Sequence, residues 1–145
     1  MLDELVAAMD ALVAADPATL AGGEAIESLH RELARLEAVT TRATAAFEAS
    51  GAWHHSGARS AATWVSFRCG VPKATARRRL HLGRALRHLP VAEAAWLSGR
   101  INAAHVSALA DARTPVTEEA LARDESMLVT KAEDLRYYQF ARVLS

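Results

Sequence analysis

The sequence contains a single cysteine and no long apolar run. Cys69 stands alone among 145 residues, which excludes a disulfide framework and any zinc site built from several cysteines of this chain. No apolar stretch approaches the roughly 20 residues that a membrane-spanning helix needs. The start, MLDEL, lacks the basic and apolar regions of a signal peptide. We therefore expect a cytoplasmic protein without membrane contact, associated with the nucleoid if it binds DNA.

Recognisable catalytic signatures are also missing. There is no nucleophile elbow, phosphate-binding loop, catalytic pair of carboxylates or metal-binding histidine cluster. His54 and His55 lie beside Trp53, but no acid or cysteine is near enough in sequence to complete a tetrahedral metal site. We interpret this pair as part of a loop. The sequence predicts no enzymatic activity, no cofactor and no bound metal.

Sustained alternation of apolar and polar residues is absent, so we expect no β-sheet. Apolar residues instead recur at steps of three and four, which predicts an all-α bundle of seven or eight helices containing a helix-turn-helix. The expected helices cover residues 2–15, 24–49, 60–68, 72–88 and 91–98, one capped by Asn102, 118–130 capped by Thr117, and a last one to about 144 that begins at a Thr130–Glu133 capping box. We expect one domain over residues 1–145, comprising an acidic helical part (1–50), a basic core (57–112) and C-terminal helices (115–145).

The net charge is zero, but its distribution along the chain is uneven. Residues 1–50 hold three Arg against nine acidic residues, whereas residues 51–115 hold ten Lys and Arg against two acidic residues. Residues 116–145 are again acidic, with four basic and six acidic residues. This segregation indicates an acidic scaffold around a segment suited to an anionic partner.

The basic segment contains a helix-turn-helix pattern at residues 62–81. Gly70 stands where the motif needs a residue in the left-handed conformation. The apolar positions of the motif are filled at four places and fail at one, where Arg79 replaces an apolar residue; the four are Val65, Cys69, Val71 and Ala76.

The second helix of this pattern has a basic face. At about 100° per residue, its apolar residues occupy one half of the helix and its basic residues the other. Lys73, Arg77, Arg78 and His81 fall at the positions that face the DNA major groove in such motifs, and we expect Arg84 and Arg87 to contact phosphates. A basic run is usually only a solvated helix face. Here, however, Glu93 is the one carboxylate in residues 51–110, so the acid–base pairs of a typical solvated helix are missing. We predict a double-stranded DNA contact.

An alternative function is protein interaction or dimerisation without direct DNA contact. Residues 24–49 carry a heptad-like apolar seam that can pair with a second copy or pack within the bundle. The seam consists of Ile26, Leu29, Leu33, Leu36, Thr40, Ala43 and Phe47. The last helix carries a second apolar stripe, which can be core or can seat a following domain, formed by Tyr137, Phe140, Ala141 and Leu144. Trp64, Phe67 and Trp96 have the spacing of core residues, and we expect His105 to be packed or to act as a helix cap.

Several stretches together resemble an uncharacterised bacterial domain that precedes HNH endonuclease modules in repeat-associated, often prophage-linked proteins. These are GARSAATWV (57–65), GVPKATARRRL (70–80), RAL (84–86), LP (89–90) and SGRINAAHV (98–106). The resemblance implies a non-catalytic N-terminal part of a nuclease, or a regulator. The chain ends at Ser145 without the His-Asn-His residues or zinc-binding cysteine pairs of an HNH module, so we expect no nuclease activity here and a possible C-terminal nuclease domain as partner.

The same core is similar to the helix-turn-helix of ParB-type partition proteins. In that likeness Lys73, Arg77 and Arg78 match recognition-helix positions, and His105 matches a packed histidine. The resemblance thus implies DNA contact through the same face of the same helix.

Overall fold

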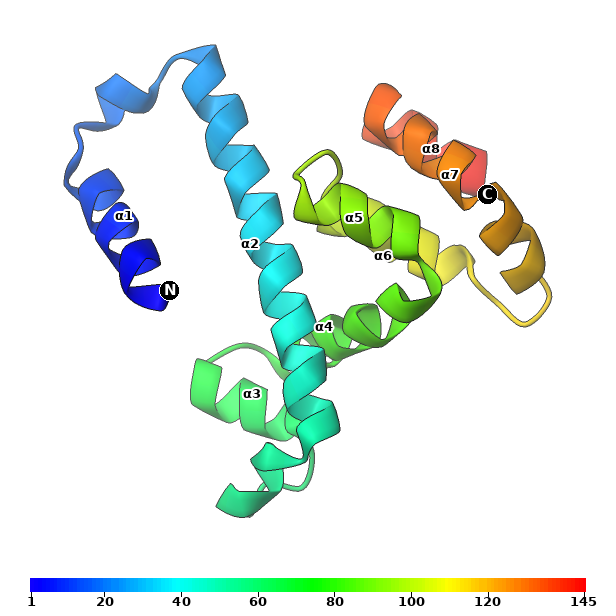
Figure 1. Cartoon of the computed structure of the whole chain (residues 1–145), viewed down its shortest axis with the longest axis horizontal. Coiled ribbons are helices and arrows are strands. Elements are labelled where there is room, and N and C mark those ends of the chain that lie inside the picture. Colours follow the sequence, from blue (N-terminus) through cyan, green and yellow to red (C-terminus); the bar gives the residue numbers. More distant parts are fainter.

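The computed structural model describes all 145 residues, and its regular structure is entirely helical (Figure 1). The all-α prediction is therefore confirmed. The eight α-helices are α1 (Leu2–Ala14), α2 (Gly23–Ser50), α3 (Ala61–Cys69), α4 (Lys73–Ala85), α5 (Pro90–Leu97), α6 (Ala103–Ala112), α7 (Glu118–Asp134) and α8 (Tyr137–Leu144). Short 3₁₀ helices occupy Pro17–Leu20, Ala52–Ser56 and Leu86–His88. No helix combines the length and apolar character that crossing a bilayer requires.

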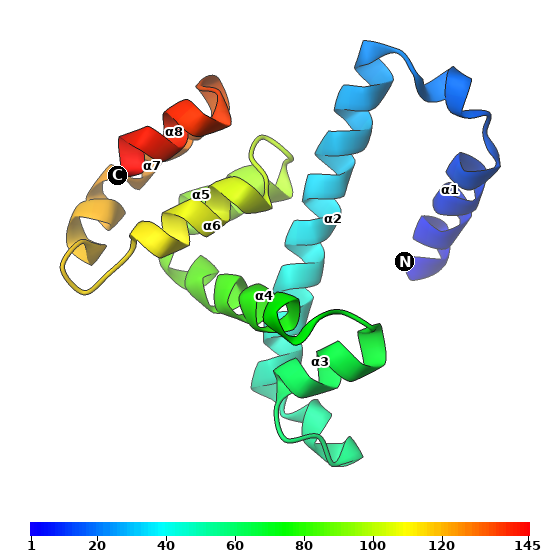
Figure 2. The same ribbon diagram turned by 180° about the vertical axis from the view of Figure 1, so that it is seen from behind.

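The long helix α2 is the axis on which the other elements are arranged. In Figures 1 and 2 it separates α1, on one side, from α5 to α8 on the other. Its buried residues Ala34, Ala38 and Thr41 are small, which lets α4 and α5 pack closely against it. Gly83 of α4 lies at this contact, where an added Cβ would stand 2.7 Å from Cβ of Ala45.

A large apolar core joins α2 to α4, α5, α6, α7 and α8. Trp96 of α5 and Phe140 of α8 are its largest fully buried side chains. A second, smaller core lies between α3 and α4, and its members are Ala61, Ala62, Val65, Ala76 and Leu80. Because Leu82 and Leu86 belong to the large core, the segment from α4 to the following 3₁₀ helix connects the two. Its position is consequently fixed from both sides.

Three local predictions are wrong. Thr117 precedes α7, but its side chain does not cap it, because its hydroxyl donates to the carbonyl of Ala112 at 2.6 Å. Thr130 does not begin the last helix: it lies inside α7, and its hydroxyl donates to the carbonyl of Ser126. The buried apolar residues Val129 and Ala132 lie on either side of it in the sequence, and no glycine or proline interrupts the helix there. The segment 51–57, expected to be a loop, mostly forms a 3₁₀ helix.

Two of the three expected core aromatics also lie outside the core. Phe67 is 84% exposed and Trp64 is half-buried, so only Trp96 is a core anchor. The reason is that α3 packs on one side only, against α4 and the 3₁₀ helix Ala52–Ser56, while its spacing pattern is compatible with either side. Trp64 packs at the edge of the small core, where its ring centroid lies 4.6 Å from that of Phe47.

His105 is both packed and a helix cap, as expected. The backbone N–H of Asn102 donates to Nδ1 of His105 at 3.1 Å, and Oδ1 of Asn102 accepts from the N–H groups of Ala104 and His105. The ring lies edge-on to Tyr137 and Phe140 of α8. Burial lowers the pKa of His105 below its usual 6.5, because the apolar surroundings disfavour the charged imidazolium.

This burial makes stability dependent on pH. Since the folded state binds the proton less readily than the unfolded state, the contribution of His105 is complete above about pH 6.5 and is lost as the pH falls below it. We expect His105→Gln, which keeps an acceptor at the capping position, to lose less unfolding free energy than the wild type between pH 7 and pH 5. Urea denaturation at several pH values measures this, and equal losses in the two proteins would contradict it.

Candidate nucleic-acid interface

The turn between α3 and α4 is built from a small number of local interactions. The hydroxyl of Ser60 accepts the N–H of Thr63 at 3.1 Å and caps α3. Gly70 ends α3 with φ = +70°, a left-handed conformation that costs a residue with a Cβ roughly 1–2 kcal/mol. The hydroxyl of Ser66 donates to the carbonyl of Val71 at 2.8 Å and holds the exit of the turn. The direction in which α4 leaves α3 is thus fixed locally.

The outward face of α4 carries an exposed basic stripe of Lys73, Arg77 and His81. These residues follow one another at steps of four, so they share one face of the helix. All three side chains are exposed, and none forms an ion pair with a carboxylate. The other side of α4 is held in the two cores by Ala76 and Leu80 among others. The stripe is therefore presented to solvent on a firmly packed helix.

The first turn of α4 adds donors to this surface. Pro72 precedes the helix, and no side chain caps it. Residues 73–75 are exposed, and the first backbone N–H that is bonded within the helix is that of Ala76, which donates to the carbonyl of Pro72 at 3.0 Å. An uncapped helix start offers free N–H groups and a partial positive charge, both of which favour an anion.

Arg78 is not part of the open stripe. Its guanidinium donates from Nη1 and Nη2 to the two carboxylate oxygens of Asp111, each at 3.0 Å, and from Nη2 to the carbonyl and hydroxyl of Ser107. These contacts with α6 oppose the prediction that Arg78 faces the DNA major groove. Residue 111 is brought to α4 by the packing of α6, a contact that no local sequence pattern reveals.

Arg84 and Arg87 differ in their surroundings. The Nη1 of Arg84 lies 3.1 Å from both carboxylate oxygens of Glu48 on α2, which offsets much of its charge. Arg87 has no acidic partner; its Nε donates to the carbonyl of Arg84 at 3.3 Å. Both side chains remain exposed.

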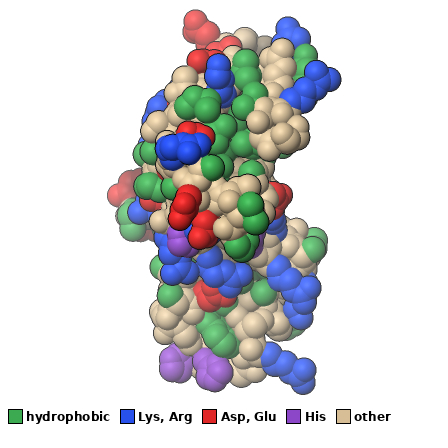
Figure 3. All heavy atoms as spheres, turned by 90° about the vertical axis from the view of Figure 1, so that its right-hand side faces the viewer, with side chains coloured by type: hydrophobic (Ala, Val, Ile, Leu, Met, Phe, Trp, Pro, Cys, Tyr) green, Lys and Arg blue, Asp and Glu red, His purple; other side chains and the backbone are tan.

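A shallow basic hollow lies beside the C-terminal end of α4. Its volume is about 210 Å³, and five of its seven lining residues are basic: His81, Arg84, Arg87, His88 and Arg113, with Ala85 and Ala110 completing it. No carboxylate belongs to the lining. Figure 3 shows a belt of Lys and Arg side chains with His at its edge across the lower half of one face of the molecule, with acidic side chains gathered mostly above it.

Residues 23–144 match the family model of DUF222, a domain of unknown function. The chain belongs to this family. The DUF222 match runs from α2 to the end of α8 and so contains the turn, the basic stripe and the basic hollow, whereas α1 precedes it. No curated protein and no solved structure shows significant similarity to the chain.

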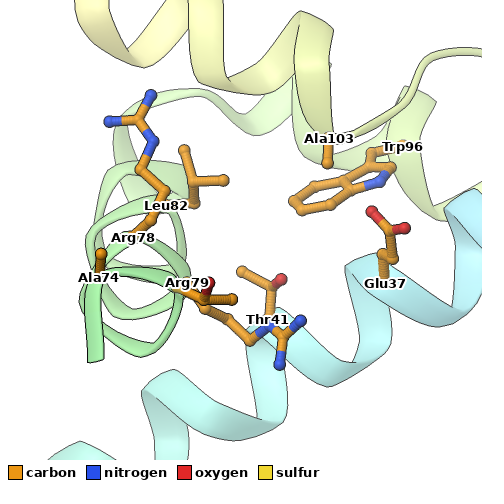
Figure 4. Close-up of a pocket in the computed structure, with 9 residues that line it drawn as sticks. Glu37, Thr41, Ala74, Arg78, Arg79, Leu82, Trp96 and Ala103 are labelled. Carbon is orange, nitrogen blue, oxygen red and sulfur yellow. The ribbon is translucent and has the colours of Figure 1, made fainter. Parts of the chain in front are cut away.

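The DUF222 domain has a second hollow on the α2 side of α4 (Figure 4), with a volume of about 360 Å³. Arg79 lines it together with Glu37, Thr41 and Trp96. Arg79, the residue that breaks the apolar pattern of the helix-turn-helix motif, is therefore half-buried at a hollow and does not lie in the core. Nε1 of Trp96 is the one buried side-chain polar atom without a hydrogen-bond partner.

Sequence reasoning missed Arg113 and gave no role to His88. Arg113 follows α6 and reaches the basic hollow only because α6 packs on α4, so its distance along the chain hides it. His88 continues the spacing of Lys73, Arg77, His81 and Arg84, and helix periodicity places it on the same basic face. His54 and His55 are exposed on the 3₁₀ helix after α2, and no group of three or more potential metal ligands exists in the DUF222 domain.

Proposed function

We propose that the DUF222 domain of this chain binds double-stranded DNA through the outward face of α4. The observation that carries the proposal is the stripe of Lys73, Arg77 and His81, which is exposed, free of carboxylate partners and fixed on a helix that two cores hold. Arginine can donate to two acceptors on guanine or bridge phosphates, and lysine supplies a point charge for a phosphate.

The basic hollow supports a division of labour along α4. A hollow without carboxylates that is lined by Arg87, His88 and Arg113 suits a backbone phosphate, and the uncapped start of α4 suits a second one. Lys73 and Arg77 lie nearer the helix start, the part of a recognition helix that contacts base edges when such a helix enters the major groove. In this proposal Arg78 does not contact DNA but holds α4 against α6.

The resemblance to domains that precede HNH modules supports the biological side of the proposal. We propose that the domain is non-catalytic and holds DNA for a nuclease module, or acts as a regulator. Either role needs binding without chemistry, and the cationic surface suits that role.

The test is the salt dependence of duplex binding. We expect fluorescence anisotropy with a random-sequence DNA duplex to show binding that weakens as salt rises. On a random-sequence duplex, where neither side chain has a specific base to pair with, we expect Lys73 and Arg77 to contact phosphates instead. The variant Lys73→Ala/Arg77→Ala then removes two phosphate contacts and should flatten the slope of log Kobs against log[salt] by about 1.8. Single-stranded DNA of the same length serves as the competing probe.

A charge-matched control is available on the C-terminal helices. Lys131→Ala/Arg142→Ala removes the same charge from exposed residues without ion pairs on α7 and α8. This control should keep the wild-type slope. An equal effect of both double variants would reduce the interaction to nonspecific charge, and an unchanged slope in the α4 variant would overturn the proposal.

The competing function, protein interaction without DNA contact, is favoured by the apolar surface on the N-terminal helices. The two functions are separable because their surfaces do not overlap: the basic stripe lies on α4, and the exposed apolar residues lie on α1 and α2. A chain that self-associates but shows no salt-dependent duplex binding would favour this alternative.

A further inference from the structure

Helix α1 is amphipathic, yet it buries none of its residues. Its six large apolar side chains are between 37% and 79% exposed: Leu2, Leu5, Val6, Met9, Leu12 and Val13. An isolated helix of 13 residues is marginal in water, because the cost of nucleation is not recovered without packing. No side chain caps its first turn either. A stable α1 therefore needs a partner for its apolar face.

The neighbouring part of α2 also exposes large apolar side chains. Ile26, Leu33, Leu36 and Val39 are 39–55% exposed, although three of them belong to the heptad-like seam. At about 100° per residue, the seam lies on a different side of α2 from Ala34, Ala38 and Thr41, which pack against the bundle. The seam is thus outside the core. Phe47, at its far end, packs on the small core, and Leu33 lies at a hollow that it shares with residues 102–104 at the start of α6.

The two apolar surfaces form the arms of one open hairpin. Figures 1 and 2 show α1 beside the middle of α2, antiparallel to it and on the side away from α5 to α8. The connection contains the 3₁₀ helix Pro17–Leu20, whose start is capped by Asp16 through a hydrogen bond from the N–H of Ala18 at 3.0 Å. This turn and residues 21–22 join the two arms, and the apolar residues of both arms stay exposed.

We infer that the α1–α2 hairpin is a dimerisation surface whose occupant is the same hairpin of a second copy. An isologous pairing places α1 and α2 of both chains in a four-helix arrangement and covers both arms at once. Complete burial of one such side chain removes roughly 60–120 Å² of apolar surface from water. The ten large apolar side chains of the two arms are exposed by about half, so together they offer several hundred Å² of apolar surface per copy. With their polar neighbours they approach the about 800 Å² per partner of a stable interface.

The charges of α1 argue against an anionic occupant. Its charged side chains are Asp3, Glu4 and Asp10, and it contains no Lys or Arg. Helices that lie on anionic lipid surfaces carry basic residues on their polar face, so a membrane is disfavoured, and DNA is disfavoured for the same reason. The inference is independent of DNA binding, because α1 contributes nothing to the basic stripe.

The experiment measures molecular mass as a function of protein concentration by sedimentation equilibrium. We expect the wild type to approach twice the 15.6 kDa of one chain as the concentration rises. The variants Leu5→Ser/Met9→Ser, on α1, and Leu33→Ser/Leu36→Ser, on α2, should each weaken association at least tenfold. Since all four side chains are exposed in the single chain, their replacement should leave the cores intact, which circular dichroism checks.

A matched control and a disulfide cross-linking experiment separate the outcomes. Val116→Ser/Val143→Ser replaces two exposed apolar residues elsewhere and should not change association. In a Cys69→Ser background, Met9→Cys/Leu36→Cys should give disulfide-linked dimers on oxidation. A wild type that stays monomeric at all concentrations, or oxidation that gives only intrachain bonds because α1 closes onto its own α2, overturns the inference.

Discussion

Gly83→Val is expected to destabilise the protein by about 3 kcal/mol and to displace α4. A Cβ at this position stands 2.7 Å from Cβ of Ala45, closer than Cβ atoms approach in folded proteins, and at a tight 3.0 Å from the backbone carbonyl of Thr41. The carbonyl belongs to the main chain of α2 and cannot rotate away. The two helices would therefore have to separate, which opens the large core. Urea denaturation followed by circular dichroism measures the loss of unfolding free energy.

A smaller substitution at Gly83 and a substitution at another glycine isolate the steric cause. Gly83→Ala sets a propensity gain of about 1 kcal/mol against the clash, and we expect the clash to prevail by about 1–2 kcal/mol. Gly23→Ala, in the first turn of α2, meets no atom within 4 Å and should be neutral or stabilising. Adding Ala45→Gly to Gly83→Ala should recover part of the loss, because it removes the nearest atom. A Gly83→Ala protein as stable as the wild type would show that the contact is looser than the structure indicates.

Glu125→Ala is expected to cost about 1–3 kcal/mol, although glutamate on a helix is usually replaceable. Glu125 of α7 is only 4% exposed, and its Oε2 accepts the buried N–H of Ala92 at 2.8 Å. That N–H belongs to the first turn of α5, whose preceding residue, Leu89, has no side-chain oxygen to cap it. A carboxylate from another helix thus supplies the missing cap and lies where the helix dipole favours negative charge.

The size of this effect depends on the hydrogen bond and not on helix propensity. Glu125→Gln keeps an acceptor and should lose less stability than Glu125→Ala. Glu119→Ala on the exposed side of the same helix has no buried partner and should stay within about 0.5 kcal/mol of the wild type. Thermal unfolding of the three variants measures the differences, and equal stability of Glu125→Ala and Glu119→Ala would show that the cap contributes little.

A stability variant outside the basic stripe also helps to test the proposed DNA binding. Glu125 holds the start of α5 and has no contact with Lys73 or Arg77, which face solvent on α4. Gly83→Val is unsuited to this comparison, because it displaces α4 itself. A variant that loses stability but keeps its salt slope where it is still folded separates the framework from the interface.

The sequence by itself determined the secondary structure and most helix ends. The periodicity of apolar residues, the cap at Asn102 and the turn glycine Gly70 are local signals, because a helix and its ends depend on neighbours within about four residues. The same periodicity identified the exposed basic residues Lys73, Arg77 and His81, since a 3.6-residue repeat places them on one face.

The tertiary structure alone decided which charges remain free and which apolar residues are covered. Asp111 binds Arg78, Glu48 binds Arg84 and Arg113 joins the basic hollow through contacts between helices far apart in sequence. Apolar spacing also could not distinguish Trp96, which is buried, from Phe67, which is exposed, or assign the seam of α2 to the outside. Periodicity defines the faces of each helix, but only the packing of one helix on another selects the face that is buried.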